Sequence, residues 1–194
     1  MAIDPPVPGV HAEARERILR TAYDLFSQRG IRGVGVDEVI RRSGVAKATL
    51  YRHFPSKDDL VLAFLQRREQ CWTLGFVEAE ARRRGGTPEE RLLAIFDVFD
   101  EWFHRDDYDA CAFINVLLEM RPAHPLGRAS IQYLENIRGI VGRMADEAGL
   151  RDTGEFARSW HILMKGSIIS AAEGDSDAAR RAQAMARSLI DQYR

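Results

Sequence analysis

The placement of proline constrains the fold of this chain more than any other feature of its sequence. Three prolines lie within residues 1–10, and the other four stand where an apolar pattern of helical period begins or ends: Pro55, Pro88, Pro122 and Pro125. A proline inside a helix removes a backbone hydrogen bond and costs about 3 kcal/mol, so helices avoid it. Because no periodic stretch is interrupted, the sequence predicts an all-α fold without strands.

Apolar residues recur at spacings of three and four along most of the chain, which predicts about nine helices. We expect them over residues 12–28, 36–43, 47–54, 56–84, 88–104, 111–120, 126–148, 154–172 and 177–193. Two helix starts carry capping boxes, Ser56 with Asp59 and Thr87 with Glu90. A further cap is expected at Asp152.

Composition excludes several classes of protein. The 194 residues are 45% hydrophobic and 29% charged, which indicates a globular chain rather than a disordered one. No run approaches ~18 consecutive apolar residues, so no membrane-spanning helix is expected. Residues 1–10 lack the pattern of a signal peptide and are expected to form a flexible arm. Two cysteines cannot form a disulfide framework, so we expect a cytoplasmic protein.

The formal net charge of −1 conceals two parts of opposite sign. Residues 11–57 carry ten Lys and Arg against five Asp and Glu, a net charge of +5. Residues 58–194 carry eighteen against twenty-three, a net charge of −5, and Asp4 supplies the remaining −1. A basic segment beside an acidic one is expected of a protein that approaches DNA through its basic end.

Residues 35–54 have the proportions of a helix-turn-helix, in which Gly44 suits the tight turn because it tolerates positive φ. Such a motif reads the major groove with the N-terminal part of its second helix. Here that helix offers donors and short side chains suited to base edges and phosphates: Lys47, Ala48, Thr49, Tyr51, Arg52 and His53. The alternative is a solvated face beside a small core, and for Phe54 we adopt the core interpretation.

The sequence GVAKATLYRHFPSKDDL, residues 44–60, resembles the DNA-binding signature of the TetR (tetracycline repressor) family of bacterial transcriptional regulators. The likeness covers residues 11–65, and beyond about residue 70 it lies only in the number and length of helices. It implies a homodimer on a palindromic DNA operator, usually a repressor released by a small molecule. The resemblance places these residues at DNA, the last of them at a phosphate: Lys47, Ala48, Thr49, Tyr51, His53 and Lys57.

The resemblance also implies a division of the chain into two domains. We expect a DNA-binding domain over residues 11–70 and an effector-binding and dimerisation domain over residues 71–194. One position departs from the family pattern, because Gly35 stands where Thr or Ser usually caps the helix and contacts a phosphate. Without a side-chain oxygen, only backbone N–H groups could meet a phosphate there.

An apolar effector pocket with a few polar groups is expected among the helices that follow residue 70. The candidate lining residues are Trp72, Phe99, Phe103, Phe113, Asn115, Glu119, Trp160, His161 and Met164. Asn115 and Glu119 share one helix face and could orient a polar group of the ligand. The alternative is that they face solvent or satisfy a backbone group, that His161 is structural, and that each aromatic belongs to the core.

Residues 154–172 are apolar on nearly every side, so this helix needs cover on every side. One face can pack on its own domain, and another, with the final helix, on a second copy related by two-fold symmetry. The candidate interface residues are Phe156, Leu163, Ser167, Ile169, Met185 and Leu189. The alternative is a central helix of a monomer.

The sequence shows no nucleophile–base pair, no Gly-rich phosphate loop and no metal-ligand spacing. We therefore expect no enzyme, no cofactor and no metal. The hypothesis is a ligand-responsive, homodimeric repressor that binds double-stranded DNA. The alternatives are an activator, a ligand-independent DNA-binding dimer, and a small helical enzyme or carrier that uses the C-terminal pocket.

Overall fold

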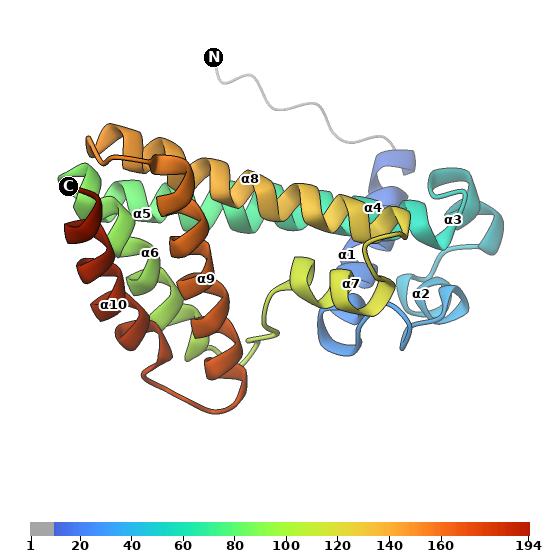
Figure 1. Ribbon diagram of the computed structural model, residues 1–194. Helices are drawn as coiled ribbons and strands as arrows, with labels where there is room; N and C mark the ends of the chain where they lie inside the picture. The colour runs from blue at the N-terminus through green and yellow to red at the C-terminus, as the bar shows by residue number, and fades with distance from the viewer. Residues whose placement is uncertain (1–9) are drawn as a thin grey trace, which may run out of the picture.

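The computed structural model describes residues 10–194, and these form helices without any strand in that range (Figure 1). The elements are α1 (Val10–Arg29), α2 (Val36–Ser43), α3 (Lys47–His53), α4 (Lys57–Arg68), η1 (Glu69–Glu78), α5 (Ala79–Arg84), α6 (Pro88–Phe103), α7 (Ala112–Met120), α8 (Pro125–Glu147), α9 (Thr153–Ala172) and α10 (Ala178–Tyr193). Because α4, η1 and α5 are continuous, the described residues form nine helical units, and the all-α prediction is confirmed. The arm expected over residues 1–10 lies outside this range, apart from Val10.

The long helix from Lys57 to Arg84 changes its winding near its middle. The segment η1 is a π-helix, in which each N–H bonds to the carbonyl five residues back, and it is α-helical on both sides. A Cβ built on Gly75 would lie 2.8 Å from the carbonyl oxygen of Gln70, one of these acceptors. Glycine therefore allows a winding that a larger residue would oppose. None of the helices formed by residues 10–194 is long and apolar enough to cross a membrane.

Both predicted capping boxes are present. Ser56 Oγ accepts a hydrogen bond from the Asp59 N–H at 3.1 Å, and Thr87 Oγ1 accepts one from the Glu90 N–H at 3.2 Å. Asp152 is the N-cap residue of α9, as predicted, but it has a φ of 47° and its side chain makes no capping hydrogen bond. Each confirmed box places the acidic partner three residues into the helix, where its carboxylate meets the free N–H groups.

Two apolar cores hold the molecule together, and both draw on α8. The first lies among α1–α4, which we call the head, and includes Phe113 of α7 and Leu134 of α8. The second joins η1, α5 and α6 to the C-terminal half of α8, to α9 and to α10, which we call the body. In Figure 1, α8 runs along the long helix from the head to the body. The head core thus includes residues well beyond position 70.

Candidate nucleic-acid interface and effector cavity

The helices α2 and α3 form the helix-turn-helix predicted over residues 35–54. Gly44 ends α2 in the left-handed conformation, with a φ of 66°, and its N–H donates to the Ile40 carbonyl at 3.1 Å. Val39, Leu50 and Phe54 are buried in the head core, so the core interpretation of Phe54 holds. This packing fixes which face of α3 is turned away from the core.

The face of α3 that points away from the head core is polar and accessible. Each of the six predicted reading residues is exposed or partly exposed: Lys47, Ala48, Thr49, Tyr51, Arg52 and His53. Tyr51 keeps 40% of its surface exposed, so its side chain is accessible to another molecule. Lys47 Nζ lies 3.5 Å from Asp37 Oδ1, but both side chains are solvated, so this ion pair opens at little cost.

The helix α2 starts at Gly35 without a side-chain cap. Gly35 has φ −84° and ψ 150°, an extended conformation that any residue adopts. A Cβ built on Gly35 would meet no atom within 4 Å. The fold therefore has room for a Thr or Ser at this position. The packing around residue 35 does not require a glycine.

Two charged side chains hold the turn between α1 and α2. Lys57 Nζ donates to the Ile31 carbonyl at 2.6 Å, and Glu119 of α7 accepts from the Ile31 N–H at 2.9 Å and from the Arg32 N–H. An ammonium has three donors, so Lys57 keeps donors for a phosphate, and its DNA contact stays a prediction. Glu119 therefore connects α7 to the head. This agrees with the alternative interpretation of the sequence, in which Glu119 satisfies a backbone group.

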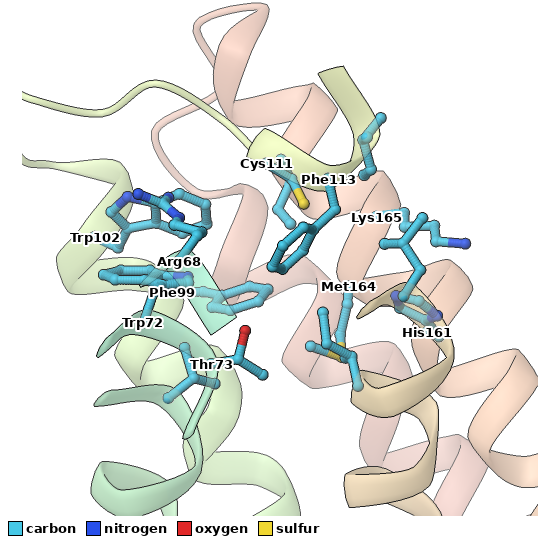
Figure 2. A pocket seen from close by; sticks show the side chains of 15 residues that line it. Arg68, Trp72, Thr73, Phe99, Trp102, Cys111, Phe113, His161, Met164 and Lys165 are labelled. Carbon is cyan, nitrogen blue, oxygen red and sulfur yellow. The ribbon is translucent and has the colours of Figure 1, made fainter. Parts of the chain in front are cut away.

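A narrow apolar cavity of ≈ 40 Å³ lies between the long helix, α6, α7, α8 and α9 (Figure 2). Five of the nine predicted pocket residues line it: Trp72, Phe99, Phe113, His161 and Met164. This volume is enough for a few water molecules. A larger ligand must therefore push the surrounding helices apart.

The other four predicted pocket residues do not line this cavity: Phe103, Asn115, Glu119 and Trp160. Trp160 is fully buried in the body core, where its ring lies 5.3 Å from that of Phe96. Asn115 Nδ2 donates to the Asp109 carbonyl at 3.3 Å, and Phe103 packs among other aromatic rings of the body. This cavity does not include these four residues, because helical spacing does not tell which apolar face meets a cavity.

Arg68 lines the cavity and was missed from the sequence. It is only 6% exposed, and its guanidinium lies 4.9 Å from the Trp72 ring and 5.7 Å from the Trp102 ring. It donates to Tyr23 Oη at 2.8 Å and to Asp109 at 3.3 Å. Burial opposes its charge, but Tyr23 and Asp109 outweigh burial and raise the pKa of Arg68. The sequence signal that could have identified Arg68 is its position on the apolar face of α4, which is buried.

The helices α9 and α10 leave large apolar side chains in solvent: Ile162 (68% exposed), Met185 (60%) and Ile169 (44%). Leu163 and Leu189 are half-buried beside them. Phe156 and Ser167 were wrongly assigned to an interface, because both are buried inside the subunit and Ser167 Oγ donates to the Met164 carbonyl. The exposed face of α9 and α10 is therefore an apolar surface of the body that could meet another molecule.

Metal and thiol chemistry find little support in residues 10–194. That part of the chain brings together no group of three side chains able to hold a metal ion. Cys71 and Cys111 are both free thiols. Burial raises the pKa of the Cys111 thiol, which keeps it in the less reactive protonated form.

Sequence comparison places the strongest similarity in the head. Residues 18–64 match the family described as bacterial regulatory proteins, tetR family. A transcriptional activator from Mycolicibacterium smegmatis, FasR, is 36% identical over 94 residues, which cover 48% of this chain and 42% of FasR. An uncharacterized transcriptional regulator from Mycobacterium tuberculosis is 41% identical over 87 residues, which cover 45% of this chain and 36% of the relative. The chain thus matches less than half of the length of these relatives.

Comparison with solved structures covers nearly the whole chain. A TetR-family transcriptional regulator from Streptomyces coelicolor has a TM-score of 0.85 and 28% identity, over 94% of this chain and 96% of that one. The reduced form of Escherichia coli NemR has a TM-score of 0.79 at 20% identity, over 92% and 98% of the two chains, and this likeness concerns the fold alone. The predicted architecture, an N-terminal helix-turn-helix head on a helical body, is confirmed.

Proposed function

We propose that this chain, a DNA-binding transcriptional regulator of the TetR family, acts as a homodimeric repressor that a small, largely apolar molecule releases from a palindromic operator. The match of residues 18–64 to the tetR family and the likeness to a TetR-family structure support the resemblance seen in residues 44–60. The observation that carries the proposal is the accessible polar face of α3, where Lys47, Thr49 and Tyr51 lie on the second helix of the motif. A helix of this kind enters the major groove, so these side chains meet base edges and phosphates.

The dimer is supported by the exposed apolar face of α9 and α10. Ile162, Ile169 and Met185 would be covered by the same face of a second copy, since a two-fold axis pairs a surface with itself. Such a dimer presents two heads to one DNA duplex. Their separation must match one helical turn, about 34–36 Å, or a multiple of it.

The response to an effector is supported by the contacts between the cavity and the head. Arg68 in the cavity wall donates to Tyr23 of α1 and to Asp109, which precedes α7. At the other end of α7, Glu119 holds the turn before α2. A ligand that widens the cavity displaces the long helix and α7 together, and both carry the head. The two heads then lose the spacing that the operator requires.

Selection from a random pool of duplex DNA tests the DNA-binding role. We expect the purified chain to select a palindromic sequence, with an affinity that falls steeply as salt rises. Lys47→Ala is expected to weaken binding and lower the salt slope by about 1, whereas Lys165→Ala, in α9, is a matched control that leaves both unchanged. Recovery of no preferred sequence would favour a helical enzyme or carrier instead.

An activator is the second candidate, because the relative from Mycolicibacterium smegmatis is named a transcriptional activator. A reporter gene behind the selected operator separates the two roles. A repressor lowers expression until the effector is added, and an activator raises it.

The matched family consists of bacterial regulatory proteins, so we place the protein in the cytoplasm, where its operator would lie.

A further inference from the structure

Two buried polar groups face the effector cavity from opposite walls. Thr73 of η1 is 5% exposed and His161 of α9 is 3% exposed, and both line the cavity (Figure 2). Among residues 10–194, His161 Nδ1 has no hydrogen-bond partner, and Thr73 Oγ1 makes no hydrogen bond of regular geometry, although it lies close enough to the Glu69 carboxyl to favour the charged form of that group. The neighbouring Glu69 carboxyl accepts its regular hydrogen bond from Asn136 Nδ2 at 3.0 Å. Folded proteins rarely leave buried polar groups in this state. A ligand that hydrogen-bonds to both side chains would satisfy them.

The rest of the cavity wall is mainly apolar. It is formed mainly by aromatic and aliphatic side chains, among them Trp72, Phe99, Phe113 and Met164. In Figure 2 the Thr73 hydroxyl points toward the space beside Phe99 and Phe113. A ligand that enters here by pushing the surrounding helices apart can therefore meet apolar surface over most of its area and a hydrogen-bonding group at each end.

Each ionisable side chain at the cavity is uncharged, paired with an opposite charge, or directed away from the cavity. Burial, with the nearby Lys165 and Arg138 charges, lowers the pKa of His161 to about 3, so its imidazole is uncharged at neutral pH. Arg68 is charged, but it is paired with Asp109. The amine of Lys165 points away from the cavity in Figure 2. Because Asp109 already balances the charge of Arg68, an anionic ligand would bring an uncompensated negative charge into a buried site, which is costly.

We propose that the effector is an uncharged and largely apolar molecule with two hydrogen-bonding groups, hydroxyl or carbonyl, that are bound by Thr73 and His161. This inference rests on the proposed function, because it names the ligand class of the same cavity. Neutral groups at these two positions satisfy both side chains without disturbing Arg68. Thr73 and His161 are then the residues that distinguish this ligand from a hydrocarbon of the same shape.

Three bicyclic probes of matched shape test the ligand class: naphthalene, a dihydroxynaphthalene and a naphthalene dicarboxylate. We expect calorimetric titration to show the diol binding at least about tenfold more tightly than the other two. Thr73→Val or His161→Leu should reduce this preference about tenfold each. Failure of the diol to bind, or equal binding of the dicarboxylate, overturns the inference.

The stability of the variants provides a second readout that a structural role would not give. Thr73→Val removes an unpaired hydroxyl and should raise the Tm of the free protein by about 2–4 °C. Ser130→Ala is the matched control, because Ser130 Oγ is also buried without a partner but lies outside the cavity. It should raise the Tm without changing probe binding. A fall in Tm for Thr73→Val would show that the hydroxyl has a structural partner and would overturn the inference. Binding of the diol without release of DNA would contradict only the proposed function.

Discussion

Gly75→Ala tests the π-helical winding of η1 most directly. In an ordinary helix this change is favourable by about 0.5–1 kcal/mol, because glycine loses more chain entropy on folding than alanine. In η1 the new Cβ lies 2.8 Å from the Gln70 carbonyl oxygen, a backbone atom that cannot turn aside. Overpacking of this kind costs about 1–3 kcal/mol. The net expectation is a loss of roughly 0.5–2 kcal/mol, where a regular helix would show a gain.

Gly139→Ala is the matched control, because Gly139 is exposed in the middle of α8 and its Cβ would meet only the end of the Arg143 side chain, at 3.6 Å. We expect urea denaturation at equal protomer concentration to show a gain for Gly139→Ala and a loss for Gly75→Ala. For a chain of this length, each kcal/mol corresponds to about 2–4 °C in Tm. Equal stabilisation by the two substitutions would show that residue 75 lies in a regular α-helix and would refute this account of η1.

Three further substitutions have defined outcomes. Gly35→Thr should raise the free energy of unfolding by about 0.4–1 kcal/mol in urea denaturation, since the position is open and gains a cap, and a lower stability would contradict the geometry. Glu119→Ala should cost about 1.5–3 kcal/mol and speed hydrogen exchange at the Ile31 amide, while unchanged exchange would argue against the contact between α7 and the head. Ile169→Glu should give monomers in sedimentation, and Leu118→Glu, at an exposed site on α7, should not; a dimer that survives Ile169→Glu has its interface elsewhere.

The sequence predicts the helices well because their signals are local. Apolar spacing and the capping boxes at Ser56 and Thr87 depend on neighbours within one or two turns, and the helix-turn-helix lies within a single short segment. The winding of η1 is different. A π-helix and an α-helix bury similar patterns over ten residues, so only an interior glycine at position 75 marked the change.

The site is less predictable because its decisive contacts join distant parts of the chain. Arg68 is buried since Tyr23 and Asp109, more than forty positions away on either side, meet it in three dimensions. The helix α9 is apolar all round, so its sequence could not tell the inward Phe156 from the outward Ile162. Packing against α10 and α8 decides that question, and no pattern within α9 encodes it.

The sharing of α7 and α8 between the two cores limits how this protein can be recombined with its relatives. A chimera cut at residue 70 would separate the head from Phe113, Leu126 and Leu134, which complete its core, and would expose the apolar surface that they cover. A transplanted head should keep its fold only if residues 112–134 travel with it. If α3 reads the operator as proposed, exchange of specificity between such relatives is better done by replacing α3 alone, because α3 packs mainly on α1 and α2.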